Sequence, residues 1–297
     1  MKVLVVGCNG MLGQDLTLHL GRSEHDAVGL DIPAIDITDG VELQSKLERL
    51  APALVINCAA YTAVDRAESE HELAFSVNRD GPANLARVCG SQGAVLVHIS
   101  TDYVFDGNHR APYRETDPAN PLGVYGQSKW EGEEAVRREL AEHLIVRTAW
   151  LFGARGQNFV KTMLRLSRER EEVRVVADQF GCPTWTGDLA DALVSVANQI
   201  EQNRASIQWG TYHFCGSGKT TWHGFAEAIV AEGRQREQLR VKRVVPITTA
   251  EYPTPAARPA WSVLDCGKIE RNFGIVANNW QAGLSAMMSE LYSLGES

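Results

Sequence analysis

The 297-residue sequence predicts an α/β protein built on a doubly wound parallel sheet, with a smaller lobe interleaved beside it. Two observations favour this fold class. Short, uniformly apolar segments alternate with helix-like segments through the first half, which is typical of strands buried on both faces of a sheet. The first apolar segment is followed by glycines spaced G-x-x-G-x-x-G and then by a helix-like segment, an order typical of α/β folds that bind a nucleotide.

The alternation can be followed in order along residues 1–150. The expected strands are 3–6, 27–30, 53–56, 94–99 and 144–147. The expected helices are 11–20, 41–50, 68–78, 82–92 and 125–142. Because each short strand is apolar throughout, we expect these strands to share one parallel sheet of the Rossmann type, covered by helices on both faces.

Beyond residue 150 the alternation becomes less regular. We expect helices at 159–170, 187–202 and 222–232 and strands at 173–176 and 212–215. The stretch 246–259 is rich in proline and has little periodicity. Residues 1–150 are therefore expected to form mainly a dinucleotide-binding domain, and residues 151–297 mainly a substrate-binding lobe with segments that return to the first domain.

The composition narrows the range of partners and compartments. A formal net charge of −8 argues against a nucleic-acid role, which needs a basic face. No apolar run reaches the roughly 20 residues that cross a bilayer, and the N-terminal segment predicts a strand rather than a signal peptide. The six cysteines are scattered without a C-x-x-C pair, which is typical of reduced thiols. We expect a cytoplasmic protein without nucleic-acid or membrane partners.

The glycine turn predicts a pyrophosphate site. Its glycines let the backbone come close to phosphate groups, and the start of the next helix supplies N–H donors and a partial positive charge. Asp31 ends the second strand, about 20 residues further on, where a carboxylate normally accepts hydrogen bonds from the adenosine ribose. No arginine lies inside the turn to meet a 2′-phosphate, so the pattern leans toward NADH and leaves NADPH open.

A tyrosine and a lysine one helical turn apart predict acid–base chemistry. Tyr125 and Lys129 are four residues apart and therefore share one face of the expected helix. A free phenol has a pKa of about 10, so we expect the Lys129 ammonium to lower the pKa of Tyr125 and also to hold the nicotinamide ribose. Thr101 follows the strand 94–99, at an edge where open α/β sheets place ligands, and its hydroxyl would complete a triad.

Over essentially its whole length the sequence resembles the extended short-chain dehydrogenase/reductase superfamily, and within it the reductases of dTDP-4-keto-6-deoxy sugars. The resemblance rests on the stretches 57–68, 100–107, 125–129, 147–150, 178–184 and 252–259. The last three are more specific than the glycine turn, because generic members of the superfamily lack them.

The resemblance implies a reaction and a set of contacts. Hydride from NADPH or NADH would reduce the C4 keto group of dTDP-4-dehydro-L-rhamnose to give dTDP-L-rhamnose, while Tyr125 protonates the alkoxide. The implied substrate contacts are Thr101, Asp102, Tyr103, Trp150 and Arg258. The planar fork of Arg258 suits the oxygens of the nucleotide diphosphate. The implied cofactor contacts are Gly7, Gly10, Met11, Leu12, Gly13, Asp31, Asp36, Ile37, Ala59, Ala60, Tyr61, Thr62, Tyr125 and Lys129.

The resemblance also raises the question of a metal and of the oligomeric state. Some relatives form magnesium-bridged dimers through acidic side chains, and Asp15 and Glu290 are the candidates here. The position of the third carboxylate falls on Gly187, with Asp188 only adjacent, which argues against Mg²⁺. A monomer and a weak homodimer are both compatible with the sequence.

Two other functions share much of the pattern. A nucleotide-sugar 4,6-dehydratase or 4-epimerase has the same glycine turn and Tyr-Lys pair, but a dehydratase needs a second carboxylate where Tyr103 stands. A non-catalytic regulatory subunit, like the β subunit of methionine adenosyltransferase, is the alternative outside catalysis. The complete set of Thr101, Tyr125 and Lys129 favours an enzyme. The preferred nicotinamide cofactor and the particular 4-keto sugar stay open.

Overall fold

The computed structural model describes residues 1–295 of the chain. Its centre is a six-stranded sheet in the order β10-β5-β4-β3-β1-β2, with every neighbouring pair parallel. The strands are β1 (Lys2–Val6), β2 (Asp26–Leu30), β3 (Leu54–Asn57), β4 (Val95–Thr101), β5 (His143–Thr148) and β10 (Gly210–His213). The predicted doubly wound parallel sheet is confirmed.

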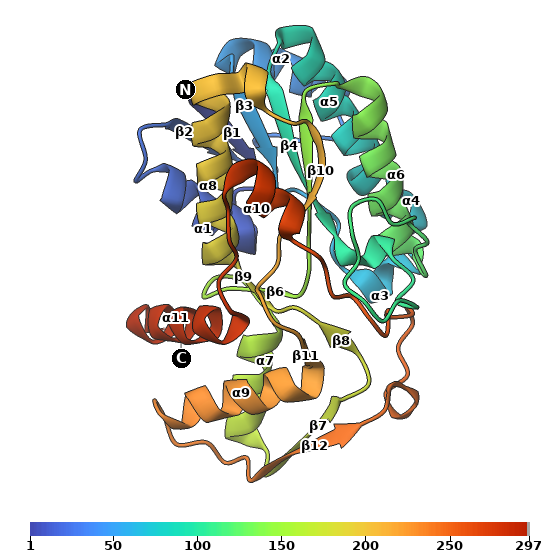
Figure 1. Ribbon diagram of the computed structural model, residues 1–297, viewed down its shortest axis with the longest axis vertical. Helices are drawn as coiled ribbons and strands as arrows, with labels where there is room; N and C mark the ends of the chain where they lie inside the picture. The colour runs from blue at the N-terminus through green and yellow to red at the C-terminus, as the bar shows by residue number, and fades with distance from the viewer. Residues whose placement is uncertain (296–297) are drawn as a thin grey trace.

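Helices cover both faces of this sheet (Figure 1). One face packs against α1 (Met11–Leu20) and α8 (Thr186–Asn203), and the other against α2 (Gly40–Leu50), α5 (Gly81–Gln92) and α6 (Val124–Glu139). β1 shows why the strands are apolar at every position. Val3 and Val5 point into the first core, whereas Leu4 and Val6 point into the second, because successive side chains of a strand alternate between faces.

A smaller lobe lies at the carboxyl ends of the strands, in the lower half of Figure 1. Its core, which includes Phe152 and Phe225, lies among α7 (Phe159–Glu169), α9 (Trp222–Arg234) and α11 (Trp280–Ser293). Its strand pairs are β7 (Glu172–Val176) with β12 (Arg243–Ile247), β6 (Leu151–Phe152) with β9 (Thr184–Trp185), and β8 (Phe180–Gly181) with β11 (Thr220–Thr221).

Segments from beyond residue 150 also contribute to the large layer. β10 forms one edge of the six-stranded sheet, and α8 and α10 (Gly267–Phe273) pack into the core on one of its faces. The assignment of one part to the dinucleotide and the other to the substrate stays a prediction. No helix among residues 1–295 is long and apolar enough to cross a membrane.

Four segments differ from the sequence expectation. The expected helix 68–78 is divided into α3 (Val64–Ala67), α4 (His71–Phe75) and a π-helical turn at Ser76–Asp80 that leads into α5. The turn carries the buried Asn78, whose side chain pairs with the backbone N–H and C=O of Tyr61. Helix α6 ends at Glu139, because Leu140 is extended. The last strand of the sheet lies two residues earlier than expected, and β12 tolerates Pro246 because it pairs with β7 alone.

Candidate active site

The glycine turn packs too tightly for any other residue at two positions. Gly7 has φ +80°, and a Cβ there would lie 2.5 Å from the backbone nitrogen of Ala59. A Cβ on Gly13 would lie 2.1 Å from the carbonyl oxygen of Gly7. The turn thus brings the start of α1 against the ends of β1 and β3, which is the arrangement that exposes backbone N–H groups to a phosphate.

A cleft of about 190 Å³ opens beside this turn. Among the residues lining it are seven of the expected cofactor contacts: Gly7, Gly10, Asp31, Asp36, Ile37, Ala59 and Ala60. Asp31 holds its position at the rim by accepting hydrogen bonds from the backbone nitrogens of Asn9 at 2.9 Å and Ile32 at 2.8 Å. Each carboxylate oxygen keeps a free lone pair for a ribose hydroxyl, so the site fits the adenosine half of a dinucleotide.

The other expected cofactor contacts near the turn, Met11, Leu12, Gly13, Tyr61 and Thr62, are not among the residues that line this cleft. Leu12 and Gly13 are buried at the start of α1, where only their backbone can face a ligand. The Tyr61 hydroxyl donates to Glu70 Oε2 at 2.5 Å.

Thr101, Asp102 and Tyr125 meet where β4 ends and α6 begins. The Thr101 hydroxyl donates to Asp102 Oδ1 at 3.0 Å, and the Tyr125 ring makes an edge contact with Tyr103, with 5.4 Å between centroids. Burial raises the pKa of Tyr125 to about 12; a hydrogen bond with Thr101 opposes this shift, and the charge of Asp102 adds to it. The phenol therefore stays protonated at neutral pH.

Asp102 is a buried carboxylate with an open position. Burial raises its pKa to about 6, although the nearby hydroxyls of Ser262 and Thr101 oppose the shift. Its Oδ2 has no hydrogen-bond partner within residues 1–295. A buried acceptor without a partner is costly unless a ligand hydroxyl meets it, which is the chemistry expected of a sugar-binding residue.

Lys129 is buried one turn after Tyr125, and its ammonium is directed at the sheet. Its Nζ donates to the carbonyl oxygen of Ile99 at 2.7 Å and lies 3.4 Å from His98 Nε2. Burial lowers the pKa of Lys129 to about 8, against the opposing charge of Glu133. The expectation that Lys129 lowers the pKa of Tyr125 is wrong for this structure, because burial of the phenol dominates and the pKa of Tyr125 is raised.

Trp150 is held in a strained conformation at the edge of the smaller lobe. Its φ is +48°, which is uncommon for a bulky residue, and its ring stacks on Trp222 with 3.5 Å between centroids. A Cβ on Gly181 would lie 2.3 Å from the same ring. Such strained positions persist where the surroundings enforce them, and they cluster at ligand sites.

Arg258 lines a second cleft, of about 620 Å³, together with Phe159, Trp222 and Tyr252. Its guanidinium already has a partner. Nη1 donates to Asp65 Oδ1 at 2.7 Å and Nη2 to Oδ2 at 2.8 Å, which ties the loop before α10 to α3. The sequence did not indicate this pair, because 193 residues separate its members.

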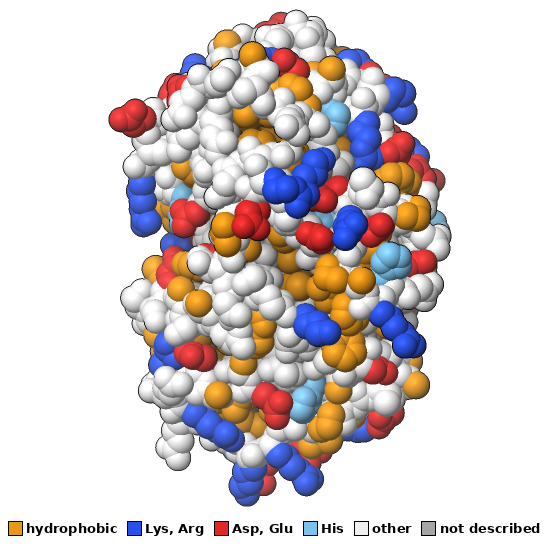
Figure 2. Space-filling model, viewed as in Figure 1, with side chains coloured by type: hydrophobic (Ala, Val, Ile, Leu, Met, Phe, Trp, Pro, Cys, Tyr) orange, Lys and Arg blue, Asp and Glu red, His pale blue; other side chains and the backbone are white. Residues whose placement is uncertain are grey.

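Figure 2 shows hydrophobic side chains gathered where the two parts of the molecule meet, with Lys and Arg side chains nearby.

The two expected metal ligands are joined by an arginine. Arg155 Nη1 donates to Asp15 Oδ1 at 2.7 Å and to Glu290 Oε1 at 2.6 Å, so a cation already bridges these carboxylates. No group of three or more His, Cys, Asp or Glu side chains among residues 1–295 is placed to hold a metal ion. Arg155 therefore takes the place between Asp15 and Glu290 that a bridging cation would occupy.

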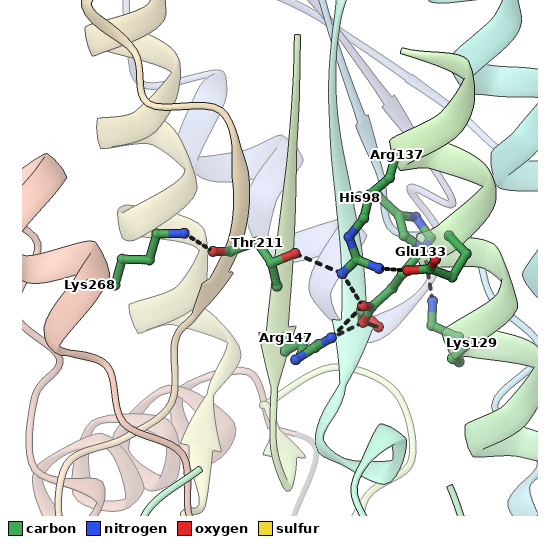
Figure 3. Close-up of polar contacts among 9 residues, drawn as sticks. His98, Lys129, Glu133, Arg137, Arg147, Thr211 and Lys268 are labelled. Carbon is green, nitrogen blue, oxygen red and sulfur yellow. Dashed lines mark hydrogen bonds and ion pairs between the residues drawn. The ribbon is translucent and has the colours of Figure 1, made fainter. Parts of the chain in front are cut away.

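A cluster of buried charges behind the catalytic candidates escaped the sequence reasoning. Glu133 in α6 accepts hydrogen bonds from Ser100 of β4 and from Arg147 of β5 (Figure 3). Its spacing was the available signal, since Glu133 follows Tyr125 and Lys129 at eight and four residues on the same helix face.

Fold and site together define a dinucleotide-binding α/β protein of the short-chain dehydrogenase/reductase type, with a tyrosine and a lysine one turn apart on α6. The model of the family described as "RmlD substrate binding domain" matches residues 1–293. The chain belongs to this family, in which it is related to the dTDP-4-dehydrorhamnose reductases.

Relatives with that name match over nearly the whole length of both chains. The protein of Burkholderia thailandensis is 43% identical over 298 residues, covering 99% of this chain and 100% of its own, and that of Escherichia coli is 38% identical with 99% of each chain covered. A solved dTDP-4-dehydrorhamnose reductase of Clostridium acetobutylicum has a TM-score of 0.91 at 39% identity, covering 98% of this chain and 100% of its own. That of Bacillus anthracis, in complex with NADP, has a TM-score of 0.89 at 39% identity, covering 97% and 99%.

Proposed function

We propose that this protein reduces the C4 keto group of dTDP-4-dehydro-L-rhamnose to give dTDP-L-rhamnose, with a reduced nicotinamide cofactor as the hydride source. The observation that carries the proposal is the convergence of Thr101, Tyr125 and Asp102 at the end of β4, in a sheet whose glycine turn also borders a cleft at its carboxyl edge. Family membership over the full length supports the same reaction, because the relatives described above are dTDP-4-dehydrorhamnose reductases.

The cofactor supplies the hydride, and this chain supplies the proton. Tyr125 is the proton donor, since its raised pKa keeps the phenol protonated until an alkoxide forms next to it. Thr101 lies beside the phenol and would turn its one hydroxyl proton from Asp102 to the substrate oxygen, and Lys129 would hold the nicotinamide ribose. Asp31 would accept hydrogen bonds from the adenosine ribose at the far end of the cleft.

The substrate contacts are assigned by chemistry. Asp102 offers a buried acceptor to a sugar hydroxyl, and Trp150 offers an aromatic face. Arg258 is proposed for the nucleotide diphosphate, because its planar fork suits phosphate oxygens and it lines the larger cleft.

We further propose a cytoplasmic monomer or weak homodimer that acts without nucleic acid or membrane. Mg²⁺ is not part of the proposal, since Arg155 pairs with both candidate carboxylates.

Tyr125→Phe tests the proton donor. The variant keeps the ring that contacts Tyr103 and loses only the phenolic hydroxyl, so we expect turnover to fall by roughly 10²–10⁴-fold while cofactor binding is retained. The measurement is oxidation of NADPH and NADH on addition of dTDP-4-dehydro-L-rhamnose. Tyr292→Phe, in α11 and bonded to Glu237, is a matched control that should keep wild-type turnover. Retention of more than about a tenth of the rate in Tyr125→Phe would exclude this role.

Asp31→Ala tests whether the cleft distinguishes NADH from NADPH at the adenosine ribose. The change should weaken NADH more than NADPH, because the carboxylate accepts from the 2′-hydroxyl of NADH and repels a 2′-phosphate. The expected loss for NADH is about 1–3 kcal/mol, measured as Kd by fluorescence titration. Equal losses for the two cofactors would show that Asp31 does not discriminate between them.

A further inference from the structure

The carboxylate of Glu133 lies buried behind the catalytic candidates. Glu133 is fully buried in α6, one turn after Lys129 and two turns after Tyr125. It accepts hydrogen bonds from Ser100 Oγ at 2.6 Å, from Arg147 Nε at 2.9 Å and Nη2 at 2.7 Å, and from Arg137 Nη2 at 2.7 Å (Figure 3). Four donors satisfy both oxygens of this carboxylate, so its position is strongly determined.

These bonds join α6 to three strands. Ser100 immediately precedes Thr101 on β4, and Arg147 stands opposite Ser100 in the register of β4 and β5. Arg137 also donates to the Thr211 hydroxyl on the edge strand β10 at 2.8 Å. Glu133 therefore helps to fix the helix that carries Tyr125 and Lys129 against the strand that carries Thr101.

The carboxylate also balances charge in a region that is otherwise cationic. Arg147 is buried beside it, with its guanidinium over the Phe105 ring, and the Lys129 ammonium is buried one turn away. Without Glu133, Arg147 would lose its buried anionic partner and Lys129 the negative charge that opposes its burial, which disfavours their charged forms.

Apart from Arg137 and Arg147, the titratable groups that face Lys129 and Glu133 are uncharged. His98 of β4 faces Lys129 and His143 faces His98, and burial lowers the pKa of both. Cys58, after β3, also faces Lys129, and burial raises its pKa to about 12. His213 of β10 faces Arg147 and Glu133, and burial lowers its pKa to about 3. Tyr125, on the same helix as Lys129, is a protonated phenol.

We propose that Glu133 is a positioning residue for the reduction: it fixes Tyr125 and Lys129 relative to Thr101 through Ser100, and it keeps Lys129 charged. This inference rests on the proposed function. A residue that only stabilised the fold would lower the melting temperature and scale the rate equally at every pH. A residue that maintains the charge of Lys129 must also change the pH at which activity is lost.

The test is the pH dependence of kcat/KM in the wild type, Glu133→Gln and Glu133→Asp. Loss of the Lys129 proton should end wild-type activity above about pH 8. In Glu133→Gln the amide keeps the size of the side chain without its charge, so this alkaline limb should move down by about 1 pH unit or more. Glu133→Asp keeps the charge and should restore the wild-type limb. Arg137→Gln removes a cation and leaves Glu133 in place. The alkaline limb of the kcat/KM profile of this variant should therefore not shift to lower pH.

Ser100→Ala tests the positioning role even if Glu133→Gln does not fold. It removes one hydrogen bond and leaves every charge in place, so kcat should fall about tenfold or more with the alkaline limb and KM unchanged. Wild-type kcat in Ser100→Ala, or a wild-type alkaline limb in a folded Glu133→Gln, would overturn the proposal. Either result together with an inactive Tyr125→Phe would leave the proposed function standing, whereas an active Tyr125→Phe would remove the proposed function itself.

Discussion

The molecule uses the same pair of groups, a carboxylate and a guanidinium bonded through two parallel contacts, in two regions that differ in burial. The Glu133–Arg147 pair lies within the sheet layer with side-chain exposures of 0% and 2%. The Asp65–Arg258 pair crosses the boundary to the smaller lobe, with exposures of 41% for Asp65 and 23% for Arg258. Two bidentate pairs therefore serve different purposes, because water competes for the second pair and not for the first.

Burial keeps the Glu133–Arg147 pair closed. Separating Glu133 from Arg147 would leave a charge in a low-dielectric interior, which costs far more than the loss of one surface contact. The exposed pair can open at little cost, since water solvates both members. In the proposed reaction Arg258 can leave Asp65 for the diphosphate, whereas Glu133 keeps its partners throughout.

Breaking the buried pair should have the largest effect on stability. Arg147→Met keeps the length of the side chain and leaves Glu133 with Arg137 and Ser100 as partners. We expect the free energy of unfolding to fall by about 3–5 kcal/mol, measured by urea denaturation. A loss below about 1 kcal/mol would show that the two pairs do not differ as burial predicts.

Breaking the exposed pair from the arginine side should change substrate binding. Arg258→Ala should raise the KM for the dTDP sugar by roughly 10- to 150-fold, the equivalent of about 1.5–3 kcal/mol, without altering the cofactor Kd. Arg258→Lys should recover part of the loss, since an ammonium cannot reproduce the fork. Steady-state kinetics test both variants, and an unchanged KM in Arg258→Ala would separate Arg258 from the diphosphate.

Changing the carboxylate of the exposed pair should have the smallest effect. Asp65→Asn removes the negative charge whose pKa the Arg258 guanidinium lowers, yet Asp65 is well exposed. We expect the free energy of unfolding to fall by only about 0–1 kcal/mol, and less still at high salt. Denaturation at low and high ionic strength measures this, and a large, salt-independent loss would mean that the pair is structurally fixed.

The sequence predicts what is local and misses what is distant. The glycine turn, Asp31 at the end of β2 and the spacing of Tyr125 and Lys129 are short-range patterns, and the structure places the first two after β1 and β2 and the pair on α6. The partners of Arg258 and Arg155 are more than 130 residues away in the sequence, so no short-range sequence pattern predicts these pairs. The raised pKa of Tyr125 follows from its burial, a property of the whole fold.

The most direct test of the proposed function follows the hydrogen atom. The protein is incubated with dTDP-4-dehydro-L-rhamnose and nicotinamide cofactor carrying deuterium at the transferable position, and the product is analysed by mass spectrometry and NMR. A reductase that protonates through Tyr125 should place one deuterium at C4 of the sugar, and Tyr125→Phe should yield almost no product. A sugar product without deuterium at C4, or cofactor that is not consumed in step with product, would contradict the account and favour an epimerase, a dehydratase or a non-catalytic subunit.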